Sequence, residues 1–283
     1  MVVAVVSIAS SAVLVEYAAA PAVALAFWRC LGGAVVLAPR ALTQPAVGAQ
    51  TKRVWLSLGA AGGALGLHFV TWLASLEMTS TAASVTLVST APMFVVGWHW
   101  LRGRPPGPGT VLGVLLAVAG VAVLAGGDLF RGDLSEGLGG DGLALVGAAC
   151  MAAYLLIGDR VRNELDTGIY APVVYAVAAA TMLPIALIGG RSLTGFDTTT
   201  WLAIGGMIAG PQLGGHTILN LLLGRIGSVL VSLALLSEPI VASALTWLIF
   251  DEVPPPLAFL GTPLVILGLV LAIRDAQPGS ADP

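Results

Sequence analysis

The chain is a succession of apolar runs separated by short connections rich in polar residues, glycine or proline. Most runs are close to 20 residues long, which is the length at which an α-helix crosses the hydrocarbon core of a bilayer. They predict ten transmembrane helices, near residues 2–19, 22–40, 54–75, 81–101, 109–126, 142–158, 170–189, 200–222, 228–250 and 256–273. We therefore expect an all-α integral membrane protein.

Composition supports this expectation. Hydrophobic residues make up 57% of the 283-residue chain and charged residues 10%, whereas charged residues are about 25% of a typical soluble domain. Such a chain has too few charges to cover a soluble surface. Its net charge of -3 and the absence of a lysine and arginine cluster argue against a nucleic-acid partner, because phosphate binding needs clustered cations.

Several features of the first half recur in the same order in the second half, which indicates an internal duplication. The matched pairs are His68 with His216, Trp72 with Asn220, Pro92 with Pro239, Trp100 with Trp247, and the Gly-x6-Gly of 113–120 with that of 261–268. We predict a first five-helix repeat over 1–126, an extracytoplasmic linker over 127–141, a second five-helix repeat over 142–274 and a disordered cytoplasmic tail over 275–283.

The basic residues predict the orientation in the membrane. If the N-terminus is cytoplasmic, the inside connections hold nine basic residues and the outside connections hold Arg131 and Arg191. This bias places both termini in the cytoplasm of a multi-pass protein of the plasma or inner membrane. Five helices per half is an odd number, so the second half must insert inverted relative to the first. Whether the N-terminus is complete is left open, although we expect no cleaved signal peptide.

The pattern resembles the ten-helix EamA-type transporters of the drug/metabolite transporter superfamily. The residues that carry the resemblance are Arg29, 90–92, Gly113, Gly120, 215–220, 237–239, Asp251, Glu252, Gly261 and Gly268. The resemblance implies two inverted repeats around a central cavity and the movement of small metabolites or drugs, often outward. Family members usually have Gly-Glu after helices 4 and 9, whereas this chain has Gly103-Arg104 after helix 4.

Two pairs of polar or aromatic residues are candidates to line a central pathway. His68 and Trp72 are four residues apart, as are His216 and Asn220, so each pair shares a helix face. Equivalent faces of inverted repeats meet where transporters bind substrate. The alternative is that these side chains hydrogen-bond neighbouring helices and serve packing alone. The other candidate cavity residues are Ser89, Thr90, Pro92, Ser237, Glu238 and Pro239.

Glu238 is the candidate for a proton-coupling group. A carboxylate inside an apolar run costs roughly 2.5–3.5 kcal/mol, so it usually faces a partner or a wet cavity. It could instead be a static partner of Arg29, or form a hydrogen bond to backbone freed by Pro239. Arg29 is a candidate counter-ion or anchor for an anionic solute, with extension to the membrane interface as its alternative.

These observations predict a secondary transporter that exports a small metabolite or drug-like solute by alternating access, with proton or exchange coupling. The alternative is a non-transporting scaffold or accessory subunit of an envelope system. An intramembrane enzyme would need His68, His216 and Glu238 within about 3 Å of one another or a shared metal. The chain has no phosphate-binding loop and no common hydrolase motif. We expect no enzyme activity, cofactor or metal; the expected partners are the solute and the lipid bilayer, and a homodimer is left open.

Overall fold

The protein is described by a computed structural model over residues 1–44, 50–125, 137–162, 165–254 and 256–276. The helices are α1 (Val2–Glu16), α2 (Ala22–Leu42), α3 (Lys52–Leu76), α4 (Thr81–Val88), α5 (Ala91–Leu101), α6 (Pro108–Ala125), α7 (Leu138–Arg162), α8 (Thr167–Ile188), α9 (Thr198–Met207), the π-helix η3 (Ile208–His216), α10 (Thr217–Leu235), α11 (Glu238–Phe250) and α12 (Ala258–Ala276). No strand occurs among these described residues. The all-α expectation is confirmed.

The helices have the length and composition of membrane spans. Within the described ranges, seven helical stretches are long and apolar enough to cross a bilayer, and α1 and α11 are shorter apolar helices. One of the seven is the continuous stretch from α9 to α10, Thr198–Leu235. The exact number of ten spans stays a prediction. The described residues do not include most of the expected linker (127–136) or the end of the expected tail (277–283). The last residues of the expected linker, 138–141, belong to α7.

Two of the expected spans are interrupted near their middle. Span 81–101 forms α4 and α5 with a break at Ser89 and Thr90, and Pro92 lies in the first turn of α5. Span 228–250 is interrupted at Leu236 and Ser237, and Pro239 lies in the first turn of α11. Proline lacks a backbone donor and is therefore favoured in the first turn of a helix, where that donor would have no partner within the helix. The two breaks occupy matching positions in the two halves.

A third irregularity separates the eighth and ninth expected spans. Gly227 has φ 79° and ψ 170°, although the flanking residues are helical on both sides. This region of backbone space is accessible in practice only to glycine. The gap between the expected spans 200–222 and 228–250 therefore contains a break in the helical backbone, and this break lies inside α10. Upstream, η3 is a π-helical segment that contains Pro211, and π-helical turns occur frequently at functional sites.

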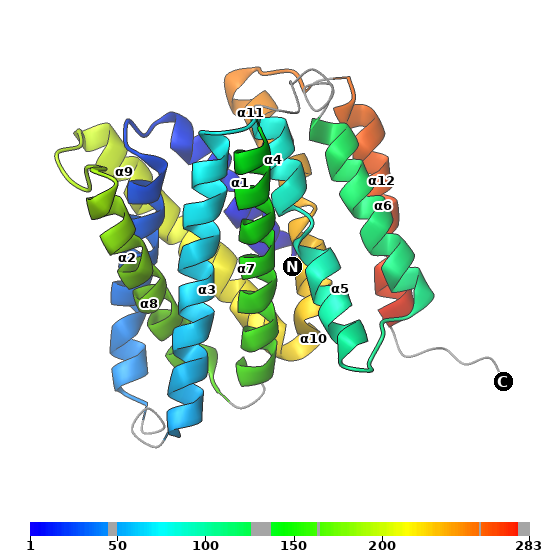
Figure 1. Ribbon diagram of the computed structural model, residues 1–283. Helices are drawn as coiled ribbons and strands as arrows, with labels where there is room; N and C mark the ends of the chain where they lie inside the picture. Colours follow the sequence, from blue (N-terminus) through cyan, green and yellow to red (C-terminus); the bar gives the residue numbers. More distant parts are fainter. Residues whose placement is uncertain (45–49, 126–136, 163–164, 255, 277–283) are drawn as a thin grey trace.

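Helix packing brings the two halves together along most of their length. The helix α6 packs against α12 at one edge of the bundle, α2 packs against α8 towards the other, and α3 packs against α7 and α8 (Figure 1). Glycines permit the first of these contacts: a Cβ at Gly120 would lie 2.7 Å from the Val265 nitrogen. Small residues let neighbouring helix backbones approach closely within a membrane.

Equivalent helices of the two halves make equivalent contacts with the opposite half. The helix α7 packs on α3 and α5, while α1, its counterpart in the expected repeat, packs on η3 and α11, the counterparts of α3 and α5. The segment from α9 through η3 to α10 runs obliquely across the bundle (Figure 1). Such equivalent contacts are what an inverted repeat predicts, and the division into two repeats stays a prediction.

Candidate functional site

A buried arginine lies at the centre of the polar residues inside the bundle. Arg29, on α2, is only 8% exposed. Its Nε donates a hydrogen bond to Oε1 of Gln212 on η3 at 3.0 Å. Its guanidinium carbon lies 4.9 Å from the centroid of the Phe69 ring on α3, a cation–π distance. Arg29 therefore binds within the protein, and the alternative in which it extends to the membrane interface is wrong.

His68 and Trp72 share one face of α3, as their spacing predicts. Their rings are stacked, with centroids 5.9 Å apart and planes at 15°. His68 is 5% exposed, and its Nδ1 lies 2.9 Å from the carbonyl oxygen of Gly147 on α7. Because a carbonyl only accepts, this bond requires the proton on Nδ1. The contact fixes the orientation of the His68 ring and its tautomer.

Phe69 connects the histidines of the two halves. His216, the last residue of η3, is 4% exposed and packs edge-on against Phe69 with centroids 6.1 Å apart. His68 contacts the same ring at 5.3 Å. Both histidines and Arg29 therefore surround one phenylalanine. The structure thus brings His68, His216 and Arg29 together, although within the described residues no hydrogen bond joins the two histidines.

Asn220 has a different environment. Its Oδ1 accepts a hydrogen bond from the hydroxyl of Tyr154 on α7, and its Nδ2 donates to the hydroxyl of Tyr175 on α8 at 3.1 Å. Tyr175 in turn is 3.1 Å from the hydroxyl of Thr217. These bonds join three helices and engage both ends of the amide. This arrangement favours the packing interpretation of Asn220 over direct contact with a solute.

The candidate hydroxyl groups bond the backbone of their own helices. Ser89, Thr90 and Ser237 donate to the carbonyl oxygens of Val85, Leu87 and Ala234 at 2.7, 2.6 and 2.5 Å. Short polar side chains commonly satisfy carbonyls in this way where a helix is interrupted. Pro92 is buried and Pro239 is partly buried beside the same breaks. These residues therefore shape the interrupted helices.

Glu238 is the first residue of α11 and is partly exposed. It lies close enough to Arg29 for their charges to interact. Among the described residues, however, no ion pair within 4.0 Å joins Glu238 to Arg29. The carboxylate is also at the N-terminal end of a helix, where the helix dipole favours negative charge. Direct static pairing with Arg29, one of the two alternatives for Glu238, is therefore absent from this conformation.

Several polar atoms of this region are buried without a partner among the described residues. They are Nη2 of Arg29, Nε2 of Gln212, Nδ1 of His216 and Nε1 of Trp72. A buried polar group without a hydrogen bond costs about 1–3 kcal/mol, and Arg29 and Gln212 already contact each other. We call Arg29, His68, Phe69, Trp72, Gln212 and His216 the central polar cluster. A solute that offers acceptor atoms would satisfy its free donors.

Two members of this cluster were absent from the expected set. Gln212 precedes His216 by four residues and Asn220 by eight, so its spacing alone places it on the same helix face. Phe69 gave no such signal, because an aromatic residue in an apolar run is ordinary for a membrane helix.

Among the described residues, no group of three His, Cys, Asp or Glu side chains could hold a metal ion. Cys30 and Cys150 are free thiols.

Comparison with known proteins adds a family and a fold. The sequence model described as the EamA-like transporter family matches residues 1–126 and 138–274. One solved crystal structure of a protein is similar over 96% of this chain and 94% of its own, with a TM-score of 0.81 and 20% sequence identity. That identity supports likeness of fold alone. The comparison with curated proteins gave no match.

Proposed function

The chain belongs to the EamA-like transporter family, and from this premise we propose that it exports a small metabolite or drug-like solute by alternating access. Members of the family are transporters, so the chain is a multi-pass membrane transporter of small solutes. The proposal adds the outward direction, residence in a plasma or inner membrane with both termini cytoplasmic, and coupling to protons or to exchange. It includes no enzymatic activity.

The observation that carries the proposal is the set of unpartnered polar atoms in the central polar cluster. Arg29, Gln212 and His216 each bury one such atom within membrane-spanning helices. Ionisable side chains at this depth are costly, and they commonly mark the pathway of a substrate. We propose that the solute binds these atoms while Asn220 and its tyrosines hold the surrounding helices in place.

The position of the cluster in the fold supports the same proposal. Arg29 comes from α2 in the first half and Gln212 from η3 in the second, so their bond crosses between the halves. Secondary transporters bind substrate at the interface between repeats, beside interrupted helices. Irregular backbone at membrane depth is tolerated only inside the protein or along a water-filled cavity. The π-helical turns of η3 meet that condition.

Alternating access also needs a contact that closes one end of the pathway. The carboxylate of Asp159 on α7 accepts hydrogen bonds from the backbone nitrogen and the hydroxyl of Ser228 at 3.0 and 2.8 Å. The Nε2 atom of His99 on α5 lies 3.3 Å from the same hydroxyl. Ser228 directly follows Gly227, where α10 bends. We propose that these bonds hold α10 against α7 of the same half and against α5 of the first half when this end is closed.

Coupling is assigned to Glu238. When ionised, its carboxylate attracts the Arg29 guanidinium and competes with an anionic group of the solute. Once Glu238 is protonated, Arg29 is free to bind that group. Protonation and solute binding would then alternate at neighbouring sites.

The test is transport by purified protein in proteoliposomes, with a panel of amino acids and cationic dyes and with or without an imposed pH gradient. We expect the wild type to move at least one class of solute and Arg29→Gln to lose that movement by at least tenfold. Arg274→Gln, which changes an exposed cation in the last turn of α12, is the matched control. Wild-type transport by Arg29→Gln would contradict the assignment of the cluster, and no transport by any variant would favour the scaffold alternative.

A further inference from the structure

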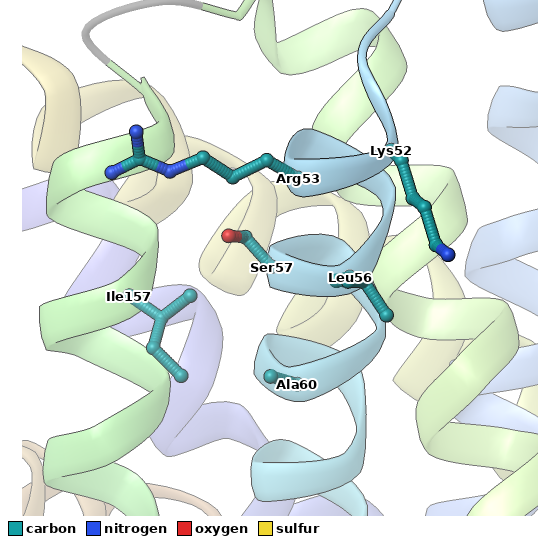
Figure 2. A pocket seen from close by; sticks show the side chains of 6 residues that line it. All are labelled: Lys52, Arg53, Leu56, Ser57, Ala60 and Ile157. Atoms are coloured by element: carbon teal, nitrogen blue, oxygen red, sulfur yellow. The ribbon is translucent and has the colours of Figure 1, made fainter.

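Two adjoining hollows lie on either side of α7. The first, the basic pocket, has a volume of about 400 Å³ between α3 and α7 and is lined by Lys52, Arg53, Leu56, Ser57, Ala60 and Ile157 (Figure 2). The second, the apolar groove, has a volume of about 740 Å³ between α5 and α7. Its lining includes Met93, Phe94, Gly97, Trp98, Leu156 and Ile157. Ile157 lines both hollows, so they adjoin each other at this residue of α7.

The basic pocket presents polar groups at one end only. Figure 2 shows Arg53 reaching from α3 towards α7 across the mouth of the pocket, with the Ser57 hydroxyl pointing into the same gap. Ile157 faces them from α7, and Lys52 extends from the other side of α3. Lys52, Arg53 and Leu56 are exposed. A charged group that enters from the surrounding membrane could therefore reach Arg53 and Ser57 directly.

A third cation lies beside the apolar groove. The guanidinium of Arg102 is 4.5 Å from the ring centroid of Trp98, and Trp98 lines the groove. The first turn of α3, which carries Lys52 and Arg53, and the end of α5, which Arg102 directly follows, lie towards the same end of the bundle (Figure 1). Neither lining set contains an acidic residue. The combined site is therefore positive at one end and apolar along its length.

We propose that this site binds one anionic phospholipid, with its phosphate against Arg53 and Ser57 and an acyl chain in the apolar groove. The planar guanidinium of arginine binds phosphate oxygens through two parallel hydrogen bonds. Basic pockets between transmembrane helices recognise anionic lipid headgroups. The groove has a volume in the range of small-ligand sites, roughly 300–1,000 Å³.

The headgroup must supply the selectivity of this site. Lipid tails are as apolar as the leucine and phenylalanine side chains they contact, so an acyl chain gains little by leaving bulk lipid for the groove. An ordinary lipid of the surrounding shell would therefore show no preference for headgroup charge. A bound anionic phospholipid would show that preference and would depend on the cations of the basic pocket.

The first experiment measures headgroup preference by native mass spectrometry of the full chain in detergent, titrated with dioleoyl phosphatidylglycerol or dioleoyl phosphatidylcholine. We expect tighter binding of phosphatidylglycerol by the wild type. Because one cation near the membrane surface contributes about fivefold to anionic-lipid affinity, the Lys52→Gln/Arg53→Gln double variant should lose affinity on the order of 30-fold. Arg274→Gln, an exposed cation of α12 outside both linings, should bind as the wild type does. Equal binding of the two lipids, or an unchanged double variant, would overturn the proposal.

A second variant tests the groove without changing charge. Gly97 lines the groove, and a Cβ there would meet no atom within 4 Å, so Gly97→Leu adds apolar volume at an open position of the groove. We expect it to weaken phosphatidylglycerol binding by at least fivefold. Gly205→Leu, at a glycine of α9 that is equally open, is the matched control. Unchanged affinity in Gly97→Leu would show that the acyl chain does not bind in the groove. If the wild type were instead a lipid-free dimer that Gly97→Leu dissociates, the groove would be an interface with a second copy of the chain.

Discussion

Glu238 and Arg29 show how much a single contact can change the role of a charged residue. The sequence allows them to be direct partners, yet Arg29 bonds Gln212 at 3.0 Å. Glu238 keeps a partly exposed position at the start of α11. A carboxylate that is near a cation without being paired to it can change its charge at a lower cost than one held in a salt bridge. This arrangement suits a group that is protonated during each transport cycle.

The prediction at this scale concerns Glu238→Gln. The amide keeps the size of the side chain but cannot ionise, so we expect pH-driven transport to fall at least tenfold while expression is unchanged. Exchange of solute without a gradient should continue, because the Arg29–Gln212 bond is retained. Vesicle transport with and without a pH gradient measures both activities. A variant that still follows the gradient at the wild-type rate would return Glu238 to a structural role.

At the scale of the helix, the interruption at Gly227 depends on one residue. Its φ of 79° and ψ of 170° lie in a region that costs a side-chain-bearing residue about 1–3 kcal/mol. We expect Gly227→Ala to destabilise the protein by about that amount and to disturb the bonds between Asp159 and Ser228. Thermal unfolding in detergent measures the loss. Gly205→Ala, at an open and ordinarily helical glycine, should leave stability nearly unchanged.

The start of α8 gives a second prediction at this scale. Asp166 caps the helix, and the hydrogen bond from the backbone nitrogen of Gly168 at 2.7 Å lowers the pKa of its carboxyl below the ordinary value. A lowered pKa in the folded state means that the ionised carboxylate stabilises the fold. This contribution is complete above the ordinary aspartate pKa, about 3.9, and is lost as pH falls through the lowered value.

The check on Asp166 is a comparison of wild type with Asp166→Asn, which retains a capping side chain but does not titrate. We expect the wild type to be slightly more stable at pH 7 and the difference to shrink below about pH 4. The effect is small because the carboxylate is largely exposed to solvent. Thermal unfolding of both proteins across this pH range measures it. A difference that stays constant with pH would contradict the role of ionised Asp166.

At the scale of the whole molecule, the inverted repeat makes a prediction about sidedness. Residues 104 and 252 follow the fourth and ninth expected spans, at equivalent positions of the two halves. If the second half is inverted, residue 104 lies in the cytoplasm and residue 252 outside, and both termini are cytoplasmic. Reporter fusions or cysteine labelling at these positions and at both ends would measure this. Labelling of residues 104 and 252 from the same side would exclude the inverted arrangement.

The sequence by itself determined the helical class of the protein and which apolar runs form its helices. Apolar runs near 20 residues predict helices because a bilayer leaves each backbone group to be satisfied within its own segment. Pro239 predicts a local opening of its span because its backbone nitrogen cannot donate, and α11 begins beside it. The spacing of His68 with Trp72 likewise predicts a shared face, and their stacked rings confirm it. All of these are local properties of the chain.

Only the tertiary structure decided which polar groups meet. Gln212 becomes the partner of Arg29 from 183 residues away, and Asn220 is engaged by Tyr154 and Tyr175 from two other helices. The sequence treats His216 and Asn220 alike, yet His216 joins the central polar cluster and Asn220 joins a packing network. The physical reason is that such contacts depend on the rotation and close approach of neighbouring helices. Packing sets both across the whole bundle, and no short stretch of sequence encodes them.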